Sequence, residues 1–302
     1  MTALLQDASR RCPGVGRCLV LSLFGLLVLL NVLLLVVLSV RSTSHPVSTL
    51  DAVTSRHTLR IGATLDYPPF SMRCADGTAA GADVDAAFAL AASLGVQLRI
   101  VPTTWSTLLD DAVAGAFDAA AGGISVTLAR LRRVGFSRGR YPGGKVVVAP
   151  CGSRHLSDTG DAPPDSAVVA VNPGGTNEEW VREHWPEANT LVVAQLSQYG
   201  AILAGRADLT VTDAIEGRLV ASRHPGALCK GDALLTHEVK AFLLPRADDV
   251  AWTAYVDRWL EEREASGEDE ATLERWLVRL GELNETEAAR ACDGATRAPV
   301  DT

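Results

Sequence analysis

From residue 58 onward, apolar residues recur along the chain with two different spacings, one typical of strands and the other typical of helices. Leu59, Ile61 and Ala63 alternate with polar or small residues, which predicts a strand. Apolar residues between positions 81 and 95 recur at helical spacing, and a glycine closes that segment, which predicts a helix. The same reasoning predicts strands over 97–101 and 117–124, and helices over 106–114 and after Thr127.

A second series of alternating strands and helices follows Pro163 and Pro164. Its predicted strands cover 167–171, 191–193 and 207–212, and its predicted helices cover 177–184, 197–204 and 214–223. Strands that alternate with helices of this length indicate βαβ units. The sequence therefore predicts an α/β fold with two lobes and a ligand cleft between them. We place lobe 1 at 58–146 and 238–283, lobe 2 at 147–237, and a disordered tail at 284–302.

The first 57 residues follow a different pattern. Residues 19–40 are almost wholly apolar, and a helix of that length reaches about 33 Å, enough to span a bilayer. We predict an N-terminal transmembrane signal anchor there, with a long cleaved signal peptide as the alternative. Three arginines precede the run, so the positive-inside rule places residues 1–18 in the cytoplasm and the remainder outside. Residues 41–57 are predicted to form a stalk.

Composition narrows the classes of function. The formal net charge of −8 disfavours a nucleic-acid partner, which would require a basic face. The cysteines and histidines lack the spacing of a metal site, and no nucleotide-binding or serine-hydrolase motif is present, so we predict no metal and no cofactor. A small molecule is the expected ligand, with the membrane as a second partner through the N-terminal helix. The sequence is also compatible with a homo-oligomer.

Candidate binding residues follow the predicted strands, because ligands of parallel sheets lie beyond the carboxyl ends of the strands. Arg130 offers a bidentate fork to a carboxylate, although a surface helix arginine is the alternative. Trp105 and Tyr67 have the shape to sandwich a flat ring, although aromatic residues at strand ends are more often core. The full set of candidates is Tyr67, Trp105, Gly123, Ser125, Arg130, Thr176, Asn177 and Asp213.

The segment ending in Arg130 carries a resemblance to a known family. Residues 124–130, with Val134-Gly135-Phe136-Ser137 after them, resemble the amino-acid-binding branch of the periplasmic solute-binding proteins. The resemblance implies that Arg130 clamps a ligand carboxylate and that Asp213 receives a ligand amine, although an ordinary helix N-cap would also explain Asp213. Ala129 departs from the family, which usually has a glutamate there.

A narrower resemblance rests on residues 171–178, 212–216 and 240–246 taken together. In this order they resemble a catalytic branch of the family, which converts prephenate or arogenate by loss of CO₂ and water. The resemblance extends from about Leu59 to Leu280. It implies a lyase, for which the alternative is a non-catalytic amino-acid-binding protein that serves transport or sensing.

The same resemblance implies roles for particular residues. Glu178 becomes the general acid, with Glu179 as the fallback, although sequence alone favours a solvated glutamate in a first helical turn. Cys151 and Cys229 match family positions, which implies a disulfide between them. Two buried thiols are the alternative to that bond.

Overall fold

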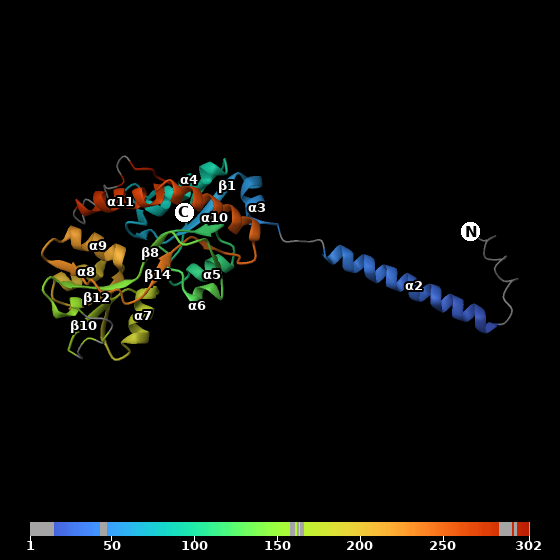
Figure 1. Cartoon of the computed structure of the whole chain (residues 1–302), viewed down its shortest axis with the longest axis horizontal. Helices are drawn as coiled ribbons and strands as arrows, with labels where there is room; N and C mark the ends of the chain where they lie inside the picture. Colours follow the sequence, from blue (N-terminus) through green and yellow to red (C-terminus); the bar gives the residue numbers. More distant parts are fainter. Residues whose placement is uncertain are drawn as a thin grey trace. The chain divides into compact units, whose positions relative to one another are not determined.

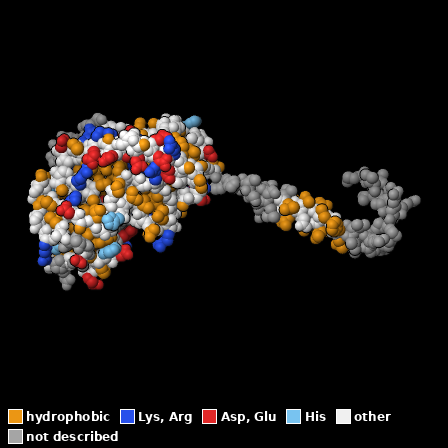
Figure 2. All heavy atoms as spheres, in the orientation of Figure 1, with side chains coloured by type: hydrophobic (Ala, Val, Ile, Leu, Met, Phe, Trp, Pro, Cys, Tyr) orange, Lys and Arg blue, Asp and Glu red, His pale blue; other side chains and the backbone are white. Residues whose placement is uncertain are grey.

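The computed structural model describes residues 15–42, 47–157, 161, 163, 166–283, 292 and 295–301. The chain divides into two compact units, residues 1–47 and residues 48–302 (Figure 1). In the first unit, Val15–Ser42 forms helix α2, whose large apolar side chains between residues 23 and 35 are exposed (Figure 2). Within the described part of the chain, no helix combines the length and apolarity that crossing a bilayer requires. The structure therefore gives no support to the predicted transmembrane span at residues 19–40.

The second unit contains two five-stranded sheets, one in each lobe. The lobe 1 sheet has the order β5-β1-β6-β15-β7, formed by Gln97–Pro102, Thr58–Ala63, Ala119–Ala120, Leu243–Leu244 and Gly135–Phe136. Strands β5, β1 and β6 run parallel, whereas β15 enters antiparallel. This return of the chain at β15 completes the first sheet after the second lobe has been built.

The lobe 2 sheet has the order β11-β10-β12-β9-β13, formed by Asn189–Val192, Val168–Val171, Leu209–Asp213, Lys145–Pro150 and Leu228–Lys230. Strand β9 runs antiparallel to β12, and its register pairs Lys145 with Asp213. Between the lobes, β8 (Tyr141–Gly143) pairs with β14 (Glu238–Lys240) where the chain crosses in each direction (Figure 1). These two sheets confirm the predicted two-lobed α/β fold.

Helices cover both sheets (Figure 1). The helices of the second unit are α3 (Thr49–Arg56), α4 (Ala82–Ser93), α5 (Leu108–Val113), α6 (Leu128–Leu131), α7 (Thr176–His184), α8 (Ser197–Leu203), α9 (Ala214–Arg223), α10 (Val250–Ala265) and α11 (Glu268–Gly281). A 3₁₀ turn (Arg154–Ser157) and a small sheet of β2 (Asp66–Tyr67), β3 (Ser71–Arg73) and β4 (Ala79–Ala80) complete the described elements. Acidic and basic side chains mix over the face carrying α10 and α11 (Figure 2).

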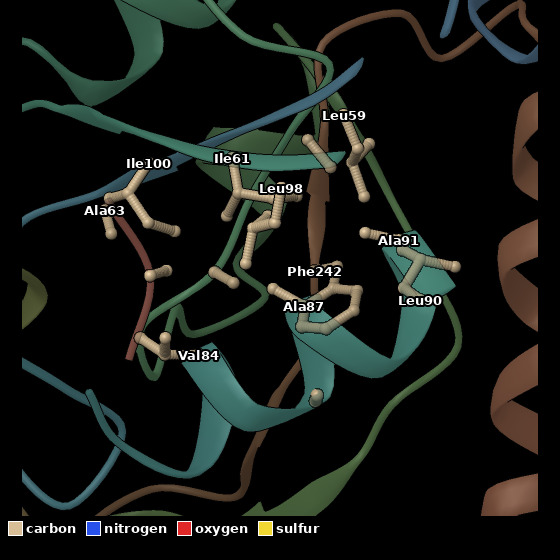
Figure 3. Close-up of a cluster of buried hydrophobic side chains, with 14 of the residues drawn as sticks. Leu59, Ile61, Ala63, Val84, Ala87, Leu90, Ala91, Leu98, Ile100 and Phe242 are labelled. Atoms are coloured by element: carbon tan, nitrogen blue, oxygen red, sulfur yellow. The ribbon is translucent and has the colours of Figure 1, made fainter. Parts of the chain in front are cut away.

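The core of lobe 1 shows why the alternating pattern predicted its elements. Leu59 and Ile61 of β1 and Ile100 of β5 point toward the apolar face of α4, where Leu90 meets them (Figure 3). All four side chains are at most 1% exposed, so each contributes about 1.5–3 kcal/mol of burial to the lobe. This packing fixes the strand ends that face the cleft.

The predicted stalk at 41–57 needs correction over its second half. Residues 49–56 form α3, which Ser48 caps by accepting a hydrogen bond from the Leu50 backbone N–H. Asp249 accepts hydrogen bonds from the Ser48 hydroxyl and the Thr49 backbone N–H at 2.8 and 2.6 Å, and Val53 is fully buried. Ser48 and Thr49 thus supply capping contacts that fix the helix to lobe 1.

The described residues of the predicted disordered tail also hold fixed positions. Cys292 forms a disulfide with Cys74, a pairing that the sequence did not predict. Ala298 pairs with Ala79, and Val300 pairs with Ile100 of β5. Residues 284–291 of the predicted tail lie outside the described residues.

Candidate functional site in the interlobe cleft

A small pocket lies between the lobes and gathers every predicted binding residue. Lobe 1 supplies Tyr67, Trp105, Gly123, Ser125 and Arg130, lobe 2 supplies Asn172, Gly175, Thr176, Asn177, Gln195 and Asp213, and β14 supplies Lys240. Its free volume is about 30 Å³, room for no more than a few waters. A ring-sized ligand therefore requires the contacts across the cleft to separate.

Arg130 is positioned by the start of α6. Thr127 precedes this helix and accepts a hydrogen bond from the Arg130 backbone N–H, while the Arg130 Nη1 donates to the Ser125 carbonyl at 2.9 Å. Burial lowers the pKa of Arg130, and the charge of Glu179 opposes that shift. Among the described residues the guanidinium forms no ion pair, so most of its donors remain for an anion. This arrangement suits the predicted carboxylate clamp.

One carboxylate oxygen of Asp213, at the end of β12, makes both an ion pair and a hydrogen bond. Its Oδ2 lies 2.6 Å from the Lys240 Nζ and also accepts a hydrogen bond from the Tyr67 hydroxyl. Burial would raise the pKa of Asp213, but the Lys240 and Lys145 charges outweigh it and the pKa lies below its usual range. Asp213 is therefore an anion whose charge is already matched within the protein.

Lys145 is a second buried cation that the sequence analysis missed. Its Nζ donates to the Thr176 Oγ1 at 2.9 Å and to the Asn177 Oδ1 at 2.8 Å, and lies 3.5 Å from the Glu238 carboxylate. Burial lowers its pKa, whereas the Asp213 and Glu238 charges act in the opposite direction. Thr176 and Asn177 thus face the cleft because a lysine on β9 holds them there.

The two aromatic residues do not form the expected sandwich. The Tyr67 and Trp105 rings contact each other edge to face, with centroids 5.5 Å apart and planes at 87°. Trp105 also donates its Nε1 hydrogen to Asp66 at 3.1 Å. Because the two rings contact each other nearly at right angles, they leave no space between parallel ring faces for a flat ligand.

Glu178, the predicted general acid, stands apart from the pocket lining. Its Oε2 accepts a hydrogen bond from the Gly174 backbone N–H at 2.7 Å, within the turn that starts α7. Gly174 has a φ of 85° and lies close against Ser106, so this turn suits glycine. The fallback Glu179 is exposed on the same helix. In this arrangement both carboxylates lie outside the group of residues that line the pocket.

Glu216 is a buried acid that the sequence analysis did not select. It lies in the first turn of α9, three residues after Asp213, and is 1% exposed. Burial raises its pKa to about 7, the Asp213 charge adds to the shift, and a hydrogen bond from the Thr212 hydroxyl opposes it. Glu216 lines a neighbouring hollow of about 560 Å³, to which Asp66 and Pro68 also contribute. One segment, residues 66–68, therefore contributes to the lining of both hollows.

The pKa of Glu216 predicts how stability depends on pH. Between the ordinary value of 4.5 and the native value of about 7, the folded chain binds more protons at this site than the unfolded chain. The free energy of unfolding therefore falls as pH rises through this interval, by roughly 3 kcal/mol for this group. Urea unfolding of the protein and of Glu216→Gln at pH 5 and pH 8 measures the effect. An equal pH dependence in both proteins would contradict it.

The fold and the cleft are those of the two-lobed solute-binding proteins. The family model for bacterial extracellular solute-binding proteins, family 3, matches residues 59–279, and the chain belongs to this family. The predicted disulfide between Cys151 and Cys229 is also present, within lobe 2.

Particular relatives narrow the comparison. The chain is 41% identical over 234 residues to cyclohexadienyl dehydratase of Pseudomonas aeruginosa, covering 76% of this chain and 86% of that protein. An ancestral amino-acid-binding protein, described as a precursor of cyclohexadienyl dehydratase, is 30% identical and superposes with a TM-score of 0.68, over 76% of this chain and all of its own. A transporter binding component from Wolinella succinogenes, complexed with lysine, gives 25% identity and a TM-score of 0.68, over 74% and 97% of the two chains.

Proposed function

We propose that this chain is a cyclohexadienyl dehydratase, a lyase that converts prephenate to phenylpyruvate, or arogenate to phenylalanine. The observation that carries the proposal is the 41% identity to a curated enzyme of that name across both lobes. The cleft supports it, because Arg130, Lys145 and Lys240 surround the pocket with buried positive charge suited to a substrate with two carboxylates.

The reaction needs little covalent chemistry from the protein. The ring carboxylate leaves as CO₂, its bonding electrons enter the ring, and the ring hydroxyl departs as water after receiving a proton. Arg130 is proposed to hold the side-chain carboxylate, with Ser125, Thr176 and Asn177 as polar neighbours of the substrate. The protein then has two tasks, which are orienting the dianion and supplying one proton.

We assign the proton donor to Glu216, with Glu178 as the second candidate. A general acid works best with a pKa near the operating pH, and that of Glu216 is about 7. Substrate entry is proposed to part the Tyr67–Asp213 hydrogen bond and join the pocket to the hollow that Glu216 lines. Glu178 remains engaged with the Gly174 N–H in its own turn, which favours Glu216 as the donor.

The second candidate function is amino-acid binding without catalysis. A relative of similar fold is complexed with lysine, and Asp213 holds an ammonium in this cleft. Incubating the purified protein with prephenate and following phenylpyruvate absorbance separates the two functions. We expect steady product formation; its absence, together with tight binding of an L-amino acid, would favour the binding protein.

The activity is proposed to take place outside the cytoplasm, in keeping with the extracellular family. Attachment to the membrane through residues 19–40 is proposed from their apolar sequence alone. Alkaline washing of isolated membranes tests it, because an anchored chain stays in the pellet and a released one does not.

A further inference from the structure

Asp213 and Lys240 form an ion pair inside the cleft. The Lys240 ammonium is buried, lies 2.6 Å from the Asp213 Oδ2, and donates to the Ser125 Oγ at 2.7 Å. An ammonium has three hydrogens, so these two contacts leave one for a further acceptor. Lys240 therefore already stands at the aspartate where an incoming amine would bind.

The charges around the pocket balance, but both buried lysines act on Asp213. Arg130, Lys145 and Lys240 bring three cations, and Asp213, the half-buried Glu238 and the exposed Glu179, whose charge acts on Arg130, bring three anions. Prephenate carries two carboxylates and a keto oxygen, whereas its amino-acid counterpart arogenate carries the same carboxylates and an ammonium. An ammonium added at Asp213 meets the like charges of Lys240 and Lys145 in a low-dielectric site, which a keto oxygen does not.

The second oxygen of Asp213 adds a requirement on the occupant. Oδ1 is buried and has no hydrogen-bond partner within the described residues. A hydroxyl or a water satisfies it without adding positive charge next to Lys240 and Lys145. An amine satisfies it only at the cost of repulsion from both lysines.

We propose that Lys240 takes the place of a ligand amine at Asp213, so that the cleft selects a 2-keto acid over the matching amino acid. The remaining hydrogen of the Lys240 ammonium is available to the keto oxygen, while Arg130 holds the adjacent carboxylate. This proposal rests on the proposed function for its substrates, and Lys240 is its specificity-determining residue.

The test compares binding of the product pair, phenylpyruvate and L-phenylalanine, by calorimetry with the full chain. We expect phenylpyruvate to bind at least about tenfold more tightly to the unaltered protein, and Lys240→Met to reverse that order. Lys230→Met, which removes a lysine of β13 away from the pocket, should keep the original ratio. An unchanged ratio in folded Lys240→Met would overturn the proposal.

A second variant covers the case in which a lone buried Asp213 prevents folding. Lys240→Met combined with Asp213→Asn removes both charges, and its binding ratio should fall to near one. Retention of the original tenfold preference in this double variant would also overturn the proposal. These binding measurements do not depend on turnover. Inactivity toward prephenate would therefore count against the proposed enzyme alone, and the ratio of the two affinities would still decide whether the cleft selects a keto acid.

Discussion

Glu216→Gln is expected to lower kcat for prephenate by about 10²- to 10⁴-fold, the usual contribution of a general acid. Glutamine keeps the size of the side chain and can still accept the Thr212 hydrogen bond, but it has no acidic proton to deliver. Product binding should change little, since Glu216 lies outside the small pocket. In the unaltered protein, kcat should fall as pH rises through about 7, because the acid must be protonated to act.

Glu178→Gln is the comparison variant for this experiment, because Glu178 is the second candidate for the proton donor. Its carboxylate accepts a hydrogen bond from Gly174 in the turn before α7, so the substitution should alter kcat by only a few fold. A large loss in Glu178→Gln with activity retained in Glu216→Gln would return the acid role to the residue that the family resemblance implied. Stopped-assay rates over pH 5 to 9 for both variants give the comparison.

Arg130→Lys is expected to raise KM for prephenate by about 10- to 100-fold while kcat changes little. Lysine keeps the charge but loses the planar fork that binds a carboxylate through two parallel hydrogen bonds. An interaction made equally in the ground and transition states changes KM rather than kcat. The measurement is a Michaelis–Menten series for each protein.

Arg133→Lys provides the control for that substitution. Arg133 follows α6 and pairs with the exposed Asp110 on the surface. Its replacement should leave KM within about twofold of the original. A normal KM in Arg130→Lys would show that the carboxylate is held elsewhere in the cleft.

Residues at the strand ends were predictable because strand periodicity and direction locate them together. Tyr67 follows β1, Ser125 follows β6, and Asp213 ends β12, so parallel topology brings all three to the cleft. Arg130 and Thr176 were candidates for the same reason, and the family resemblance added the carboxylate-binding role of Arg130. Geometry then placed them on opposite sides of one pocket.

The two lysines and Glu216 were not predictable for identifiable physical reasons. Lys145 begins β9, and only the antiparallel direction of that strand, which hydrophobic pattern does not reveal, brings it opposite Asp213. Lys240 lies on a strand that crosses between lobes, so its contact with Ser125 depends on tertiary structure. Glu216 occupies a first helical turn, where a glutamate is usually solvated, and its burial comes from the packing around it.

The pairing of residues 298–301 with lobe 1 has a consequence for solubility. Strand β5 is the outermost strand of its sheet, and Ile100 bonds through its N–H to Pro299 and through its carbonyl to Asp301. A bare edge strand offers unpaired backbone groups to the strands of other molecules and promotes aggregation. The final residues shield that edge, and the Cys74–Cys292 bond tethers them to the lobe they protect. Reduction of this bond would thus make the edge of β5 easier to expose and favour self-association, at a place remote from the cleft.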